Sequence, residues 1–531
     1  YIWQQDSVDP GLKTTLPPAE SAMCAGFDPA LAEEAISQYA PYSYDATLAM
    51  ATAIHEIIED AQAANIKPVF DGTTIMARLM SSSFSVAGIS GDVTFDSSNG
   101  DRGLGIPFLM RNHIAGGDQF THVGNVKADG TIDQLDGLAP EAWEYAKADS
   151  SADVHVRPTA ADIFSTPETL GLCGDPTAAE GEAGHSLGAY CAGRGLCTAS
   201  GCLCDEGFGG DFCVSTTNRP STVKIGGLYP LIKEGGVIDN GGKRRLLGFL
   251  IAMQEINDKT DGHYDDLLPE TTLTFSLRDS KRDSGVASIE ATDLLTNGAQ
   301  ALVGAASSGP SMQVAKLMAV YNVAQISYSS TSAQLSDVSV YPYFARTPPT
   351  DALQSKVMAA FIKNELGWNT AVTLSGDDGY SAGGITDFKK AAVDSGIDVM
   401  VSMQFVRGTS SSLDDELQAL KDTGVKLIVM FAQADDIVSV LNHAKGLEMW
   451  GSDGYTWIIS ELILGSYADL IAGLGSQAEV DLALQGAFVP APSNGIGSAA
   501  YTSLETRWAA MPNTATSGPS GGCSEATDND G

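Results

Sequence analysis

One stretch of the sequence has the residue types of a catalytic nucleophile. Residues 379–383 are Gly-Tyr-Ser-Ala-Gly, which matches the Gly-x-Ser-x-Gly pattern that places a hydrolase serine on a sharp strand-to-helix turn. Such a serine needs a histidine base and an oxyanion hole. The only histidine downstream of Ser381 is His443, which lies inside a helical pattern, and no His-Gly-Gly segment is present. We therefore predict that the chain is not an enzyme, and we interpret these small residues as a loop that a ligand approaches closely.

The remaining histidines predict no metal chemistry. They occur singly along the chain, and a structural role is expected for each: His55, His113, His122, His155, His185 and His263. No phosphate-binding loop, metal-ligand cluster or dinucleotide fingerprint is present. The sequence therefore predicts no cofactor and no metal site.

The charge of the chain excludes two classes of partner. Among 531 residues, 66 are acidic and 30 are basic, for a net charge of −36. Nucleic acid and anionic membrane surfaces need Lys and Arg to neutralise phosphates, so neither is an expected partner. The excess suits a soluble protein in a salty or calcium-rich medium. No apolar run approaches the roughly 20 residues that span a bilayer, and the abrupt start at Tyr1 predicts a mature or excised piece of a longer protein.

Six of the eight cysteines crowd into one segment. They are Cys173, Cys191, Cys197, Cys202, Cys204 and Cys213. About forty residues bury too little apolar surface to fold alone, so cross-links must restrict the unfolded chain, which implies an oxidising, extracellular compartment. The spacing, which ends Cys204-Asp-Glu-Gly-Phe-Gly-Gly-Asp-Phe-Cys213, resembles the EGF-like family. A zinc site is the alternative, with His185 as the only candidate histidine ligand.

The EGF-like resemblance implies the disulfides Cys173–Cys197, Cys191–Cys202 and Cys204–Cys213. Calcium-binding members carry an acidic-Asn signature before the first cysteine, and residues 165–172 do not match it, so no calcium is predicted in this module. The sequence contains no Asn-x-Ser/Thr sequon, so the extracellular expectation rests on the cysteines alone.

From residue 223 to residue 460, short apolar runs alternate with amphipathic stretches. The predicted strands are 223–228, 273–277, 301–306, 324–328, 370–374, 398–405, 426–431 and 455–459. The predicted helices are 245–258, 284–297, 310–321, 351–366, 383–395, 412–422 and 434–447, with Ser284 and Asp351 as expected N-caps. This alternation predicts βαβ units and parallel sheets covered on both faces. The rhythm changes at 340–350, where we expect the chain to cross between two lobes that face each other across a cleft.

Several segments carry a family resemblance. They are Gly304-Ala-Ala-Ser-Ser308, Ile326-Ser-Tyr-Ser-Ser-Thr-Ser332, Phe344-Ala-Arg-Thr-Pro-Pro-Thr-Asp351, Leu366-Gly-Trp368 and Gly376-Asp-Asp-Gly-Tyr380. In this order they resemble the extracellular ligand-binding region of class C G-protein-coupled receptors and natriuretic-peptide receptors, relatives of the type I periplasmic binding proteins. The resemblance implies an α/β fold of two doubly wound lobes, a clamshell, beside the small disulfide-rich EGF-like β module.

The opening residues resemble the later portion of the same family. Tyr42-Ser-Tyr-Asp45 begins a predicted helix, and the segments 88–102 and 120–130 resemble the closing β-segment and last hairpin. The expected organisation is therefore a carboxyl-terminal clamshell part (1–150), a linker (151–172), the EGF-like module (173–213) and an amino-terminal clamshell part (215–531). The chain is either a circular permutant that closes on itself or one out-of-phase period of a tandem array, and we favour the array. In both cases Cys24 and Cys523 fall in one loop, as a predicted bridge.

The resemblance also implies roles for cleft residues. The carboxylate of an amino acid falls to Ser307 or Ser308 and to the stretch Ser329–Thr331, and its ammonium to Asp351 and Glu461. Tyr380 would cover the ligand, and Arg245 would hold a distal carboxylate. The alternative for Arg245 is a helix-surface residue, and the alternative for the Ser pairs is helix capping. Glu461 is one methylene longer than the aspartate usual in the family.

We therefore expect a non-catalytic extracellular building block that assembles head to tail with identical units into a cell-surface or filament-forming protein. The alternative is a receptor ectodomain that binds an amino acid or similar small molecule in the cleft.

Overall fold

The computed structural model describes most of the chain. Its described ranges are 36–103, 107–113, 120–126, 132–134, 195–198, 201–204, 208–209, 215–216, 219–232, 236, 238–408, 413–465 and 467–510. These residues divide into two compact units. The larger unit contains residues 1–57, 69–135 and 221–531, and the smaller contains 58–68 and 136–220.

The first lobe of the larger unit is built on a parallel sheet of five strands. In spatial order they are β11 (Thr272–Asp279), β10 (Thr222–Tyr229), β12 (Ala301–Val303), β13 (Ala324–Ser327) and β14 (Phe344–Arg346). Their helices are α6 (Asn240–Asn257), α7 (Ser284–Thr296) and α8 (Ser308–Tyr321). The short apolar strands β12 and β13 are completely buried, as expected for a sheet covered on both faces.

The second lobe has an eight-stranded sheet. Five parallel strands come first, in the order β16 (Asp398–Phe405), β15 (Thr370–Gly376), β17 (Leu427–Phe431), β18 (Thr456–Ile459) and β19 (Phe488–Pro492). The helices are α9 (Asp351–Asn364), α10 (Gly379–Asp394), α11 (Leu413–Asp422), α12 (Ala434–Gly446), α13 (Tyr467–Leu474) and α14 (Gln477–Ala483). Three antiparallel strands complete the sheet: β3 (Phe108–His113), β4 (Phe120–Val126) and β5 (Ile132–Gln134).

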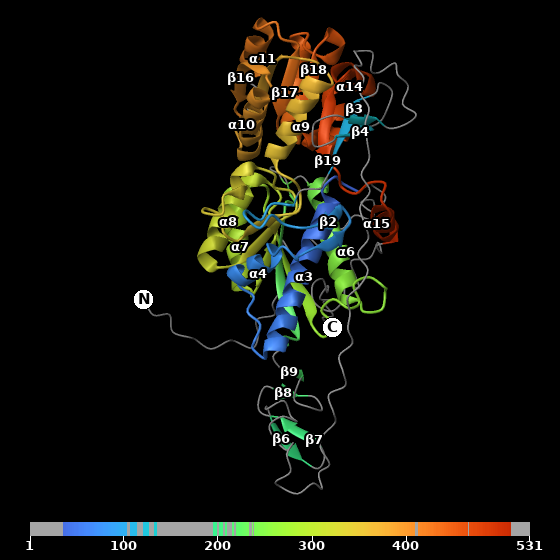
Figure 1. Ribbon diagram of the computed structural model, residues 1–531. Coiled ribbons are helices and arrows are strands. Elements are labelled where there is room, and N and C mark those ends of the chain that lie inside the picture. Colours follow the sequence, from blue (N-terminus) through green and yellow to red (C-terminus); the bar gives the residue numbers. More distant parts are fainter. Residues whose placement is uncertain are drawn as a thin grey trace, which may run out of the picture. The chain divides into compact units, whose positions relative to one another are not determined.

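The opening segment therefore contributes to both lobes. In the second lobe β19 pairs with β3, from Phe488 opposite Asn112 to Pro492 opposite Phe108. In the first lobe, Figure 1 shows α3 (Ala40–Ala64) and α4 (Gly72–Leu79) in blue among the helices around the green and yellow sheet. The hairpin β1 (Val86–Gly88) with β2 (Gly91–Val93) and the helix α15 (Ala499–Ala510) complete this unit.

The predicted two-lobed α/β fold class is confirmed, with two corrections at helix starts. The N-cap of α7 is Asp283, whose side chain accepts from the Val286 amide, and not Ser284. The N-cap of α9 is Thr350, whose side chain accepts from the Leu353 amide, and not Asp351. In both helices the residue named from the sequence has already entered the first turn, where its own backbone is helical.

The smaller unit carries part of the cysteine-rich segment. Two antiparallel pairs are described in it, β6 (Gly195–Thr198) with β7 (Gly201–Cys204) and β8 (Phe208–Gly209) with β9 (Ser215–Thr216). Cys197 lies opposite Cys202 in the first pair. The predicted disulfides all involve at least one cysteine outside the described residues or one whose side chain is not described, so the EGF-like module and the Cys24–Cys523 bridge stay predictions.

Candidate functional site

A cleft lies where the carboxyl ends of the two parallel sheets meet. Each sheet has its first strand between its second and third (β10 between β11 and β12, β15 between β16 and β17), and such reversals of strand order place ligand sites at the strand ends. The cleft encloses about 340 Å³, including the part open to solvent. It is lined by Arg245, Arg282, Ala306, Ser307, Ser308, Ser329, Tyr380, Gln433, Glu461 and Leu462.

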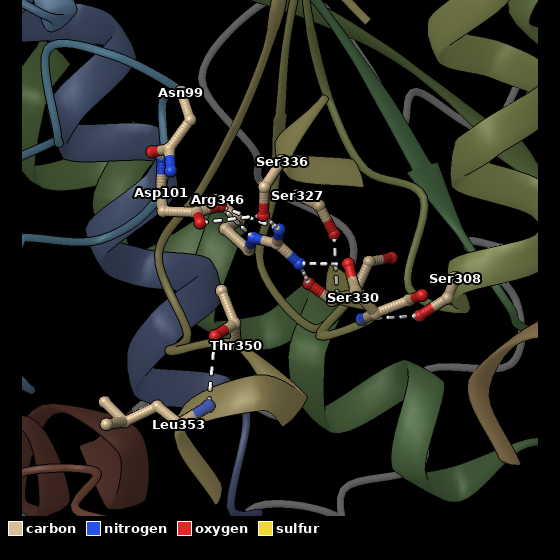
Figure 2. A network of polar contacts seen from close by, with 10 residues as sticks. Asn99, Asp101, Ser308, Ser327, Ser330, Ser336, Arg346, Thr350 and Leu353 are labelled. Carbon is tan, nitrogen blue, oxygen red and sulfur yellow. Dashed lines mark hydrogen bonds and ion pairs between the residues drawn. The ribbon is translucent and has the colours of Figure 1, made fainter. Parts of the chain in front are cut away.

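The first lobe presents hydroxyls and the start of α8 to this cleft. Ser307 is the N-cap of α8 and its side chain makes no capping hydrogen bond, while Ser308 begins the helix. A helix N-terminus attracts anions because its first amides have no partner within the helix. Deeper hydroxyls are used internally, since Ser330 donates to Ser311 over 2.8 Å. Figure 2 shows Ser308 at one edge of this serine-rich network.

The same network is anchored by a buried ion pair. Arg346 is fully buried, pairs with Asp101 over 2.7 Å and donates to the Ser332 carbonyl over 2.7 Å. It also donates to Ser336 over 2.6 Å (Figure 2). The guanidinium therefore ties the opening segment to the loop after β13 and holds the serines in place.

Two arginines of the first lobe line the far end of the cleft. Arg282 follows β11 and pairs with Asp239 over 2.6 Å, and Arg245 lies on α6 with its guanidinium 5.4 Å from the centre of the Tyr39 ring. Burial lowers the pKa of Arg245, and the neighbouring Arg282 lowers it further. Burial alone would raise the pKa of Asp239, but Arg282 and Arg245 hold it below its ordinary value. Two guanidiniums thus share one carboxylate, which leaves a net positive charge at this end.

The second lobe contributes a carboxylate that already has three donors. Glu461 is buried and follows β18. It accepts from the Tyr39 hydroxyl over 2.6 Å, from the Gln354 amide over 2.7 Å and from the Tyr380 hydroxyl over 3.1 Å. The predicted covering residue, Tyr380, therefore also helps to hold the predicted ammonium partner.

The second predicted acidic residue, Asp351, lies in a different cavity. This narrow space, the hinge cavity, has about 150 Å³ including the part open to solvent, and it is lined by Tyr39, Phe108, Thr331, Pro349, Thr350, Asp351, Gln354, Glu461 and Pro492. Asp351 is 1% exposed, and neither of its carboxylate oxygens has a hydrogen-bond partner of good geometry among the described residues. Burial and the nearby Glu461 raise its pKa well above the ordinary value, while Thr331 and Arg346 act in the opposite direction.

The structure thus brings most of the predicted site residues together in the open cleft: Arg245, Ser307, Ser308, Ser329, Tyr380 and Glu461. Thr331 and Asp351 instead line the hinge cavity, and Glu461 borders both spaces. The sequence analysis did not name Arg282, Gln433, Tyr39 or Gln354. Arg282 and Gln433 directly follow the carboxyl ends of β11 and β17, so the rule for strand ends could have found them.

The Gly-Tyr-Ser-Ala-Gly stretch has a structural explanation. The Ser381 hydroxyl is buried and donates over 2.6 Å to Asp378, the N-cap of α10. The glycines face the other lobe: a Cβ on Gly379 would lie 3.9 Å from Met312, and one on Gly383 would lie 3.2 Å from the Ser332 hydroxyl. The His443 ring contacts Asp414 over 2.7 Å. The close approach is therefore made by the first lobe, and the serine completes a helix cap.

Among the residues described, no cluster of three or more His, Cys, Asp or Glu is arranged to hold a metal ion. Within the same residues, no helix combines the length and apolar character needed to cross a bilayer.

Comparison with known proteins matches the same regions. The family described as "Receptor family ligand binding region" matches residues 10–103 and 244–511. Metabotropic glutamate receptor 8 of Mus musculus is 27% identical over 289 residues, which cover 48% of this chain and 30% of the receptor. Metabotropic glutamate receptor 4 of Macaca fascicularis is 26% identical over 274 residues, which cover 43% of this chain and 29% of the receptor. The chain thus spans under a third of these relatives.

Proposed function

We propose that this chain, which belongs to the family of receptor ligand-binding regions, binds an amino acid in the cleft between its two lobes. The observation that carries the proposal is that groups of both charges line one cleft. Arg245 and Arg282 line it together with Glu461, and the N-terminus of α8 lies in its wall. A zwitterion fits such a surface because each of its charges meets a partner of opposite sign.

The proposed roles follow from this order. Ser307, Ser308 and Ser329, with the amides at the start of α8, donate hydrogen bonds to the α-carboxylate. Glu461 accepts the ammonium, and Tyr380 covers it. The two guanidiniums favour a ligand with an acidic side chain, since among the described residues the ion pair observed for them is the one from Arg282 to Asp239. The relatives named as glutamate receptors support the same ligand class.

A thermal-shift and calorimetry screen tests this proposal. L-Glutamate and L-aspartate are expected to stabilise the full chain more than neutral L-amino acids or the D-enantiomers. A ligand at 100 times its dissociation constant adds about 2.7 kcal/mol. Arg245→Met should weaken the binding of L-glutamate and leave the binding of a neutral amino acid unchanged. Arg78→Met, which breaks a partly exposed ion pair with Glu56, should change the affinity for neither ligand. Failure of every L-amino acid to stabilise the protein would contradict the proposal.

A second candidate function is favoured by the order of the two clamshell parts along the chain, since the carboxyl-terminal part comes before the amino-terminal part. The part that forms β3–β5 precedes the cysteine-rich segment, yet it pairs with β19 from the far end of the chain. The same pairing between neighbouring copies would produce a head-to-tail array, so we propose an extracellular repeat unit as the alternative. Sedimentation velocity tests the alternative, because an array predicts oligomers whose size grows with protein concentration. A single monomeric species at every concentration, from about 1 μM to about 100 μM, would contradict it.

A further inference from the structure

The predicted ligand residues are divided between two spaces by one side chain of the opening segment. Tyr39 is 2% exposed and lies immediately before α3. It lines the hinge cavity, and the Glu461 carboxylate that it contacts borders both the hinge cavity and the open cleft. On the far side of this contact lies Asp351, which borders only the hinge cavity.

Tyr39 belongs to the first lobe, whereas Glu461 belongs to the second. The helix that follows Tyr39 packs on α6, since Tyr44 donates to Glu255 and a Cβ on Gly248 would lie 2.4 Å from the Ala40 carbonyl. Arg245 of α6 covers the Tyr39 ring. The hydrogen bond of 2.6 Å from the Tyr39 hydroxyl to Glu461 therefore joins the two lobes.

The contact also uses the chemistry that a ligand needs. A hydroxyl that donates to a carboxylate replaces an ammonium donor at the same acceptor, and hydrogen bonds to charged groups are about twice as strong as neutral ones. Gln354 and Tyr380 take the other positions on Glu461, and both come from the second lobe. Tyr39 is thus the only one of the three observed donors that lobe opening would remove.

Resting on the proposed function, we propose that Tyr39 is a specificity-determining residue that competes with the ligand ammonium for Glu461 and separates Asp351 from the cleft. An amino acid that displaces the Tyr39 hydroxyl gains both carboxylates. A ligand without an ammonium cannot make this exchange and is excluded. The same hydrogen bond holds the lobes together, so its loss loosens the contact between the starts of α8 and α10, where Gly309 and Gly379 face each other.

Tyr39→Phe tests the proposal because it removes the hydroxyl and keeps the ring that Arg245 covers. Tyr229→Phe is the matched control, since its buried hydroxyl bonds to Ser43 over 2.9 Å within the first lobe. Calorimetry of the full chain with L-glutamate should give a dissociation constant roughly tenfold lower for Tyr39→Phe than for wild type. In the variant the ligand ammonium no longer has to displace the hydrogen bond from Tyr39 to the Glu461 carboxylate. Tyr229→Phe should match wild type.

Amide hydrogen exchange provides a readout that needs no ligand. Residues 307–311 and 378–384 should exchange several-fold faster in Tyr39→Phe than in wild type, while 427–431 in the core of the second lobe should be unchanged. Equal exchange in the two proteins, or an unchanged or weaker affinity of Tyr39→Phe for L-glutamate, overturns the inference. Absence of amino-acid binding in wild type, Tyr39→Phe and Tyr39→Ala, with faster exchange in the variants, instead overturns the proposed function and supports the contact between lobes.

Discussion

The open cleft and the hinge cavity share Glu461 but differ in how they accommodate a buried carboxylate. In the cleft, Glu461 receives hydrogen bonds from Tyr39, Gln354 and Tyr380. In the hinge cavity, Asp351 receives none of good geometry, and its pKa is raised well above the ordinary value by burial and by Glu461. Both residues are almost completely buried, and the two sites differ in the hydrogen-bond donors that surround the carboxylate.

The largest expected effect comes from the fully buried Arg346. Arg346→Met removes the partner of Asp101 and three further hydrogen-bond donations at the first lobe. Breaking a buried pair from one side costs about 3–5 kcal/mol. Urea unfolding should show a loss of this size, against less than about 1 kcal/mol for Arg78→Met at a partly exposed pair. A loss of unfolding free energy below about 1 kcal/mol for Arg346→Met would show that the buried carboxylates near the hinge do not need this cation for stability.

An intermediate effect is expected from Asp351→Asn. Because the folded pKa of Asp351 is raised, the folded state binds a proton more tightly than the unfolded chain. Its contribution therefore favours folding at low pH and is lost as pH rises from about 4, the unfolded value, through the raised pKa. The variant should remove this pH dependence of the unfolding free energy, and it should stabilise the protein at pH 7 by roughly 1 kcal/mol. Urea unfolding at several pH values measures this dependence, and Asp398→Asn, at an exposed position, is the control. If the pH dependence of stability is the same in Asp351→Asn as in wild type, Asp351 is not the group responsible.

The smallest effects are expected where the two lobes touch. Gly379→Ala has room for its methyl group and gains helix propensity, so it should stabilise by up to about 1 kcal/mol. Gly383→Ala gains the same propensity but must displace the Ser332 hydroxyl, which lies 3.2 Å from the new Cβ. The melting temperature of Gly379→Ala should therefore exceed that of Gly383→Ala by roughly 2–4 °C. A higher melting temperature for Gly383→Ala than for Gly379→Ala would contradict the close contact between Gly383 and the Ser332 hydroxyl.

Much of the fold follows from local pattern. The strand predicted at 398–405 and the helix predicted at 284–297 agree with β16 and α7 to within a residue, because apolar periodicity and β-branched runs are local properties. The helix caps were displaced by one residue, since a cap depends on the backbone angles of a single position. Beyond residue 460 the sequence analysis named no elements, and the structure adds α13, α14, β19 and α15.

The site was predictable only in part. Residues that follow a parallel strand reach the cleft by topology alone, which is why Ser308 and Glu461 line it as expected, while their roles toward a ligand stay predictions. Tyr39 is more than 400 positions from Glu461 in the chain, so no local signal indicates that its hydroxyl meets this carboxylate. The separation of Asp351 from the cleft depends on that same contact. Both facts depend on the packing of the opening segment, which periodicity does not specify.

The ladder between β19 and β3 has a consequence for how the protein responds to cleavage. Pro490 and Pro492 provide no amide hydrogens, so fewer than the usual number of main-chain bonds join the two partners. Side-chain packing adds to the cohesion between the opening segment and the rest of the chain, and Leu48 and Ile54 of α3 are fully buried. A protease that cuts between residues 135 and 220 would therefore produce two polypeptides that migrate separately on a reducing, denaturing gel and elute together under native conditions.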